Sequence, residues 1–186
     1  MKIPFNFKQS ILFCYKLYSK TVKNEDRLYD FVNQRLKSFL IDQGLRYDIA
    51  EAILHLGYIN ISYAVQIGKS LEDFRSNEAD HFKKIVETAV RVKRLAVKSN
   101  SNKLSSKLFK TDSEKISFRL LDLYNDKSKL LDIKYLFELS SSLVIYFEEV
   151  MVMDKNKEIQ KNRLSFMRQC DDLYLRVADF EKIVLG

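Results

Sequence analysis

Turn-forming residues are scarce in this sequence, which has four glycines and one proline among its 186 residues. A sheet protein of this length needs many tight turns, and glycine and proline supply most of the backbone conformations that such turns require. Leucine, lysine, glutamate and arginine, which favour helices, recur instead at three- and four-residue spacings. We therefore predict an all-α chain that forms a single helical bundle of about seven to nine helices.

The spacing of the apolar residues places these helices along the chain. The predicted ranges are Phe7 to Tyr18, Asn24 to Gly44, Ile49 to Leu56, Ser62 to Phe74, Asp80 to Lys98, Thr111 to Asn125, Asp132 to Phe147 and Asp154 to Val177. Residues 1–24 are predicted to be an N-terminal helix at the junction to a preceding domain, and residues 25–186 the helical domain itself. The stretch from Ser99 to Lys107 is predicted to be a loop because it is rich in Ser, Asn and Lys.

Several helix ends carry local signals. Gly44 is predicted to end its helix in the left-handed conformation, and Gly57 to close the next one. Two residue pairs at a spacing of three predict capping boxes, Asp48 with Glu51 and Thr111 with Glu114.

Two of the predicted helices have well-defined apolar faces. In the helix Asp80 to Lys98 the face consists of Phe82, Ile85, Val86, Ala89, Val92 and Ala96. In the last helix it consists of Ile159, Phe166, Met167, Cys170, Leu173, Tyr174 and Val177, while Leu164 and Leu175 lie on another side. A helix with apolar residues on two sides is expected in the middle of a bundle.

The residues that most often carry catalysis or metals are few. His55 and His81 are the two histidines, and neither has carboxylates or thiolates at metal-ligand spacing, so both are predicted to be surface or capping side chains. Cys14 and Cys170 lie 156 positions apart and are predicted to be small core hydrophobes in a reducing compartment. We expect no catalytic residue, no metal site and no enzymatic activity of the chain acting alone.

Positive charge is concentrated on one helix. The chain has a formal charge of +7, which favours an anionic partner such as a nucleic acid. In the helix Asp80 to Lys98 the cations lie opposite the apolar face, within an arc of about 100° that is interrupted by Glu87; they are Lys83, Lys84, Arg91, Arg94 and Lys98. The following loop adds Lys103, Lys107 and Lys110. Two interpretations stay open, a stripe that follows an RNA backbone and a solvated helix face.

Arg163 lies on the apolar side of the last helix, where an unpaired guanidinium is costly. We favour a structural arginine held by an inward carboxylate, Glu148 or Asp179, and keep an RNA contact as the alternative. Asp48 is predicted to be structural through its capping role.

Aromatic side chains are abundant, with ten tyrosines and thirteen phenylalanines. Most of them must fill the core. Tyr47, Tyr58 and Phe109 are candidates for exposed rings that stack on unpaired bases.

Five sequence segments resemble a known family. Three are near the C-terminus: VMVM at Val150 to Met153, NRL at Asn162 to Leu164 and RVADF at Arg176 to Phe180. Two lie upstream: GLRYDIAEAIL at Gly44 to Leu54 and RVKRLAVK at Arg91 to Lys98. Together they resemble the C-terminal part of the bacterial glycyl-tRNA synthetase (glycine–tRNA ligase) beta subunit, from about Arg27 onward.

This resemblance implies a helical anticodon-binding domain of the type named for an Asp-Ala-Leu-Arg motif (DALR-like), although that four-residue string does not occur here. It implies that the chain binds the glycine tRNA by its anticodon arm. The expected protein partners are the alpha subunit, which would bind ATP, Mg and glycine, and the remainder of the beta subunit. Arg94 stands where relatives commonly have Asn, which favours a phosphate contact, and Glu148 stands where they commonly have Asp.

Two alternatives remain at this point. One is the related C-terminal domain of arginyl-tRNA synthetase. The other is a helical interaction module that docks a catalytic protein subunit through its apolar faces. A cytoplasmic protein without a membrane segment is expected in each case, because no apolar run approaches the roughly 20 residues that cross a bilayer.

Overall fold

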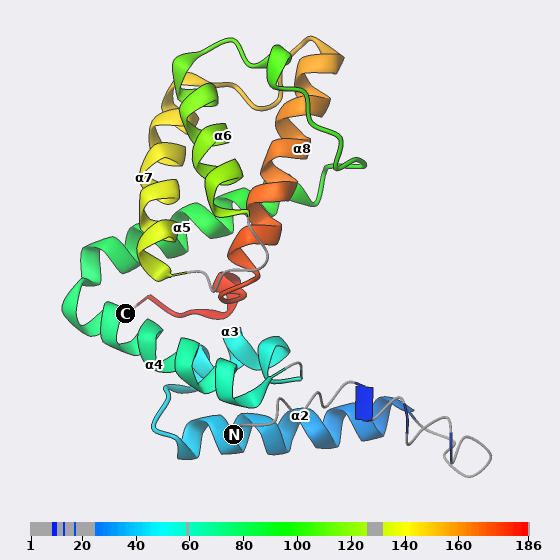
Figure 1. Ribbon diagram of the computed structural model, residues 1–186, viewed down its shortest axis with the longest axis vertical. Helices are drawn as coiled ribbons and strands as arrows, with labels where there is room; N and C mark the ends of the chain where they lie inside the picture. Colours follow the sequence, from blue (N-terminus) through cyan, green and yellow to red (C-terminus); the bar gives the residue numbers. More distant parts are fainter. Residues whose placement is uncertain are drawn as a thin grey trace. The chain divides into compact units, whose positions relative to one another are not determined.

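The computed structural model describes residues 9–10, 13, 17, 25–58, 60–125 and 132–185 (Figure 1). Within these ranges the regular elements are seven α-helices and two short 3-10 helices, and no strand is present. The prediction of an all-α chain is therefore confirmed. Most of the predicted helix Phe7 to Tyr18, including Cys14, lies outside the described residues, as does the candidate cap Asn24. Among the described helices, none is both long enough and apolar enough to cross a bilayer.

The chain forms two compact units. The first contains the described residues up to Asp73 together with Lys182–Val184, and the second contains Phe74–Glu181. The predicted boundary at residue 24 falls where the structure does not describe the chain, so it stays a prediction.

The first unit is built from α2 (Glu25–Asp42), α3 (Tyr47–Gly57) and the first part of α4 (Ile61–Asn77). α2 packs against α3. The core contains apolar side chains from all three helices, among them Leu36, Leu40, Ile49, Ile53 and Leu71.

Two glycines of this unit have different roles. Gly44 has a φ of +89°, which confirms the predicted left-handed stop after α2. The N–H of Gly44 donates to the carbonyl of Ile41 at 2.8 Å, and the positive φ turns the chain so that the N–H of Leu45 donates to the carbonyl of Leu40 at 3.4 Å. Gly57 is the last residue of α3, so the prediction that it closes this helix is confirmed, although it does so without a positive φ. A Cβ at Gly57 would lie 2.7 Å from Cδ2 of Leu36, and the glycine is needed for close packing of α3 on α2.

The predicted capping box at Asp48 is also wrong. Arg46 occupies the N-cap of α3 without a side-chain cap, and Asp48 lies in the first turn. The Asp48 carboxylate accepts hydrogen bonds from Nε of Arg46 at 2.6 Å and from the backbone N–H of Val184 at 2.8 Å. Glu51 pairs instead with Lys37 of α2. Asp48 is thus a buried structural residue, as expected, but it holds the C-terminal segment and does not cap a helix.

The second unit is built from four long helices: α5 (Ala79–Ala96), α6 (Asp112–Tyr124), α7 (Ile133–Glu149) and α8 (Lys157–Tyr174). α5 packs against both α7 and α8, and α6 packs against the same two helices (Figure 1). The short 3-10 helix Ser106–Leu108 lies in the connection from α5 to α6, and a second one, Phe180–Lys182, follows α8.

The apolar faces predicted for α5 and α8 are confirmed. On α5 the buried set comprises Phe82, Ile85, Val86, Ala89, Val92 and Ala96. On α8 and just beyond it, the buried set comprises Ile159, Phe166, Met167, Cys170, Leu173, Tyr174 and Val177. Leu164 is buried as well, as expected for a helix that contacts two neighbours, α5 and α6. Burial raises the pKa of the Cys170 thiol, which fits the prediction of a core side chain.

The capping box at the start of α6 is confirmed. Oγ1 of Thr111 accepts the N–H of Glu114 at 3.2 Å, and Oε2 of Glu114 accepts the N–H of Thr111 at 2.9 Å. The same carboxylate oxygen accepts the N–H of Lys110 at 2.7 Å. The second oxygen of Glu114 is left for another partner.

Replacing Gly44 tests the left-handed turn. No atom outside the neighbouring residues lies within 4 Å of a Cβ built at Gly44, so a substitution there meets strain without a clash. We expect Gly44→Ala to lower the free energy of unfolding by about 1–2 kcal/mol, measured by urea denaturation. Gly44→Asn, which tolerates this conformation better, should cost less. An alanine variant as stable as the original chain would contradict the assignment.

Candidate nucleic-acid interface

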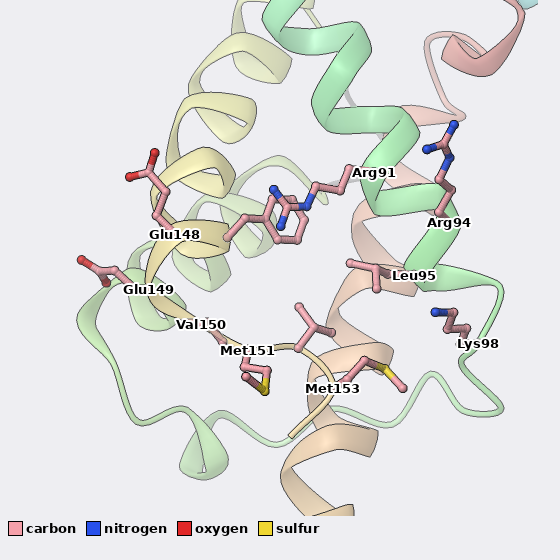
Figure 2. Close-up of a pocket in the computed structure, with 11 residues that line it drawn as sticks. Arg91, Arg94, Leu95, Lys98, Glu148, Glu149, Val150, Met151 and Met153 are labelled. Atoms are coloured by element: carbon pink, nitrogen blue, oxygen red, sulfur yellow. The ribbon is translucent and has the colours of Figure 1, made fainter. Parts of the chain in front are cut away.

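Three of the predicted cations line one depression. Arg91, Arg94 and Lys98, from the C-terminal half of α5 and the residues after it, form one wall of a hollow of about 630 Å³. The opposite wall is the end of α7 and the segment that follows it, residues 147–153. Figure 2 shows Arg91 extending from α5 toward α7, and Arg94 and Lys98 close to the C-terminal end of α5, with the Arg94 side chain extending away from α7. We call this hollow the α5–α7 groove.

The position of these cations follows from the packing of α5. Its apolar face is buried against α7 and α8, which leaves the other side of the helix to solvent. Arg91, Arg94 and Lys98 follow at steps of three and four residues and are all exposed. With a rise of 1.5 Å per residue they span about 10 Å along the helix axis, so one strand of nucleic acid could contact all three.

Arg91 has an aromatic neighbour. The Cζ atom of its guanidinium lies 4.1 Å from the centroid of the Phe147 ring. This is a close cation–π contact, with the planar group over the ring face. Arg91 stays exposed while Phe147 is buried, so the ring supports the guanidinium from the protein side.

The wall formed by residues 150–153 is apolar, and its side chains alternate in burial. Val150 and Val152 are buried, whereas Met151 is 72% exposed and Met153 is 44% exposed. Exposed methionines are flexible and polarisable, and they adapt to the faces and edges of aromatic rings. The segment VMVM therefore contributes to the core with its valines and to the groove with its methionines.

Two carboxylates complete this wall. Glu148 and Glu149, the last residues of α7, are exposed and line the groove (Figure 2). The prediction that Glu148 pairs with Arg163 is wrong, because Glu148 is exposed and Arg163 pairs with Glu114 and Asp154. The groove thus has cations on α5 and acids at the end of α7.

The remaining predicted cations lie outside this groove. Lys83 and Lys84 are in the first half of α5, where Lys83 is 3.9 Å from Glu87 and Lys84 lies 5.4 Å from the centre of the Phe137 ring. Lys103 and Lys107 are exposed on the loop after α5. Their proposed contact with RNA stays a prediction.

Lys93, which lies among the groove cations in the sequence, has a different role. Its Nζ atom is 2.7 Å from Asp179 and 2.8 Å from Glu181, and it is half-buried. Asp179 is therefore structural, as predicted, but its partner is Lys93 instead of Arg163. The helical step could have revealed this, because Lys93 is about 200° from Arg91 around the helix.

Arg163 is buried and its charge is fully paired. Its Nε atom donates to Oε1 of Glu114 at 2.7 Å, and its Nη1 atom donates to Oδ2 of Asp154 at 2.7 Å and to the carbonyl of Met151 at 3.0 Å. The interpretation of a structural arginine is confirmed, while both predicted partners are wrong. The capping box offered a signal, because a glutamate at that position has one carboxylate oxygen free for an inward cation.

Arg163 also positions the groove wall. Met151 and Asp154 both belong to the segment between α7 and α8, and Glu114 begins α6. The guanidinium therefore ties this segment to α6 and α8 together. The backbone carbonyl of Met151 accepts a hydrogen bond from Arg163, while the Met151 side chain is exposed in the groove.

The basic loop after α5 is attached to α8. The buried amide of Asn162 accepts the N–H of Ser105 at 2.7 Å and donates to the carbonyl of Ser105 at 3.1 Å. Ser165 donates to the carbonyl of Ser101 at 2.8 Å, and Gln169 donates to that of Asn102 at 2.9 Å. These bonds fix the backbone that carries Lys103 and Lys107.

The aromatic candidates for base stacking differ in exposure. Tyr47 is 65% exposed, and Nζ of Lys37 lies 3.7 Å from its ring centre. Tyr58 is half-buried and its hydroxyl donates to Asn33. The prediction of an exposed Phe109 is wrong: the ring is 6% exposed and packs against Phe118 and Phe166 at centroid distances of 5.3 and 5.7 Å. Stacking on Tyr47 or Tyr58 stays a prediction.

Neither histidine lies in a site with metal-binding geometry among the described residues. Nδ1 of His81 is 2.9 Å from Glu78, and its ring centre is 4.0 Å from that of Phe137. His55 is half-buried in the last turn of α3. In the part of the chain that the structure describes, no group of three or more His, Cys, Asp or Glu side chains is arranged to hold a metal ion.

Curated relatives match most of the chain. The glycine–tRNA ligase beta subunit of Clostridioides difficile is 28% identical over 167 residues, which are 86% of this chain and 24% of that subunit. The corresponding subunit of Desulforamulus reducens is 30% identical over 84% of the chain, and that of Oceanobacillus iheyensis is 32% identical over 87%. This chain is homologous to part of glycine–tRNA ligase beta subunits. It spans about a quarter of the length of these relatives, and no family model matches it.

The resemblance to beta subunits found from the sequence is thus confirmed, and the structure shows what its motifs do. In the segment NRL, Asn162 holds the basic loop and Arg163 holds the groove wall. In the segment RVADF, Asp179 pairs with Lys93 of α5. The segments that carry the likeness to the ligase subunits are therefore largely structural, whereas the exposed cations belong to the segment RVKRLAVK.

Replacing Glu114 tests the buried ion pair. We expect Glu114→Gln to lower the free energy of unfolding at neutral pH by about 3 kcal/mol, because the variant leaves a buried guanidinium with one partner fewer. Asp112→Asn is the matched control: Asp112 is an exposed acid of the same helical turn, 3.2 Å from Lys115, and its loss should cost less than about 1 kcal/mol. Equal losses would contradict the role of Glu114.

The same variant should also change the response to acid. Burial alone would raise the pKa of Glu114, but hydrogen bonds from Arg163 and from the N–H groups of Thr111 and Lys110 outweigh it, and the net pKa is lowered. A lowered pKa stabilises the fold above the ordinary carboxyl value of about 4.3, and this contribution is lost as the pH falls through the folded value. Urea denaturation between neutral pH and about pH 3 should show a shallower loss of stability in Glu114→Gln.

Proposed function

We propose that this chain binds tRNA as the anticodon-arm recognition domain of a glycine–tRNA ligase beta subunit. The observation that carries the proposal is the gathering of Arg91, Arg94 and Lys98 on one exposed side of α5. Homology to beta subunits supports RNA as the anionic ligand, because the relatives are named as subunits of a tRNA ligase. The glycine tRNA is the proposed ligand.

The proposed role is positioning. The domain would hold the anticodon arm so that the acceptor end of the tRNA reaches a separate catalytic centre, which accelerates the reaction through orientation alone. The alpha subunit, which would bind ATP, Mg and glycine, and the remainder of the beta subunit are the proposed protein partners. The chain itself would carry out no chemical step.

The physical basis is phosphate neutralisation. Lysine and arginine side chains that contact phosphates release condensed counterions, so affinity falls as salt rises. Within the described part of the chain, no carboxylate forms an ion pair with the three groove cations, whereas Lys93 and Arg163 are paired with carboxylates. Their charge is therefore available to an anionic ligand.

A protein-docking function is the second candidate, and one observation favours it. On the first unit, Phe31, Val32, Arg35, Leu36, Phe39 and Ile61 line an almost wholly apolar hollow of about 340 Å³. Phe31 is 55% exposed and Phe39 is 41% exposed. Exposed apolar surface of this kind is typical of interaction sites. It is compatible with tRNA binding, because the two surfaces belong to different units.

Charge reversal tests the proposed function. We expect Arg91→Glu, Arg94→Glu and Lys98→Glu together to abolish binding of a glycine tRNA transcript, because each change replaces a phosphate-binding cation with a repelling anion. Fluorescence anisotropy at several salt concentrations gives the affinity. For the original chain, the logarithm of the binding constant should fall with the logarithm of salt concentration with a slope of about −2 to −3 if three phosphates are neutralised.

A charge-matched variant serves as the control. Lys115, Arg119 and Lys134 are exposed cations of α6 and α7 that do not line the groove, and their joint replacement with Glu changes the net charge equally. This variant should retain most of the affinity. Equal losses in both triple variants would show binding through net charge alone and would contradict the groove. An arginine tRNA that binds better than the glycine tRNA would favour the arginyl-tRNA synthetase alternative.

A further inference from the structure

Arg91 differs from the other two groove cations in how it is held. Its guanidinium lies 4.1 Å from the centre of the buried Phe147 ring, whereas Arg94 has no cation–π contact with any described ring. A planar cation that is supported on one face presents its other face as a flat surface. Arginine stacks on aromatic groups in this way, and lysine, with a compact ammonium group, does not.

The support also lowers the entropic cost of binding. A long side chain that is free in solution loses rotamer freedom when it is fixed by a ligand, at a cost of about 0.5–1.5 kcal/mol. The contact with Phe147 restricts Arg91 before any ligand arrives. The part of the groove at Arg91 therefore favours a ligand that stacks on the guanidinium over a phosphate that is only loosely bound.

The charges along the groove indicate where the phosphates lie. Glu148 and Glu149 line the groove on the α7 side, and Figure 2 shows their side chains extending from the end of α7 away from α5. Carboxylates in the last turn of a helix oppose the helix dipole, so the stability of α7 does not explain their presence. They repel an anionic backbone from the α7 wall, which leaves Arg94 and Lys98 as the cations best placed for phosphates.

The apolar part of the groove suits an uncharged ring. Met151 and Met153, both exposed, belong to the same lining as Arg91. A thioether beside an aromatic edge gives a favourable contact of about 0.3–1.5 kcal/mol. A hollow of about 630 Å³ is also within the usual size range of small-ligand sites and is larger than one base requires.

From these observations we infer that an unpaired nucleobase stacks on the exposed face of Arg91 in the α5–α7 groove, while Arg94 and Lys98 bind the neighbouring phosphates. The ligand class is single-stranded RNA, such as a hairpin loop, in preference to a paired stem. Bases in a duplex are stacked on one another and do not offer a free face to the protein. This inference rests on the proposed function and adds to it the residue that distinguishes an unpaired strand from a duplex.

The test compares two RNA probes and two arginine variants of the full chain. One probe is a hairpin with the fluorescent base aminopurine in its unpaired loop, and the other is a fully paired duplex with the same number of phosphates. Arg91→Lys keeps the charge and removes the flat guanidinium. Arg119→Lys, at an exposed position of α6 outside the groove, is the matched control. Affinities are measured by anisotropy, and stacking is measured by quenching of the aminopurine fluorescence.

We expect Arg91→Lys to reduce the affinity for the hairpin roughly tenfold more than the affinity for the duplex, within the range that the loss of one stacked base spans. The quenching seen with the original chain should be lost in Arg91→Lys and retained in Arg119→Lys. If the original chain binds the hairpin and Arg91→Lys keeps both the affinity and the quenching, the stacking inference is overturned while the proposed function stands. If the original chain binds neither RNA, the proposed function fails as well.

Discussion

The second unit depends on one buried ion pair. Arg163 of α8 donates to Glu114 at the start of α6, and the same guanidinium holds Asp154 and the carbonyl of Met151 in the segment after α7. Desolvating such a pair is costly, so it contributes little net stability compared with apolar packing. Its effect is geometric, because it fixes α6, α8 and the connecting segment relative to one another. The wall of the α5–α7 groove is built on this arrangement.

Two kinds of charge therefore coexist in this unit. The charges of Arg163 and Lys93 are compensated by carboxylates of the chain itself. Arg91, Arg94 and Lys98 are exposed. Arg91 contacts the ring of Phe147 and not a carboxylate. The net charge of +7 does not distinguish paired cations from exposed ones, because that difference depends on the position of each side chain in the folded structure. The positive charge that a nucleic acid could contact is that of the exposed cations.

Much of the fold could be predicted from local patterns. The apolar face of α5, the capping box at Thr111 and the left-handed Gly44 all depend on residues close together in the sequence, and all are confirmed. Most of the errors concern contacts between distant residues. The capping box predicted at Asp48 was a local pattern, and it failed because the Asp48 carboxylate binds the N–H of Val184, 136 positions away. The partner of Arg163 is Glu114, which lies 49 positions away, and burial of Phe109 depends on Phe166 of another helix. Gly57 could be recognised as a helix end but not as a close contact with α2. For the site, the cations of α5 could be identified from their angular positions on the predicted helix. The opposite wall, Phe147 to Met153, could not be predicted, because it depends on the packing of α5 on α7.

An apolar side chain in place of Arg163 could fill the same volume, and such exchanges of buried charges often leave a fold stable. It could not donate to the carbonyl of Met151, which would then lack the partner that the structure gives it. Asp154 and Glu114 would also lose their shared cation, and the connecting segment would no longer be joined to α6. The exposed methionines and the end of α7 belong to that segment or lie next to it. A polar centre beneath the groove is therefore better explained by the need for a fixed groove wall than by the stability of the helical unit alone.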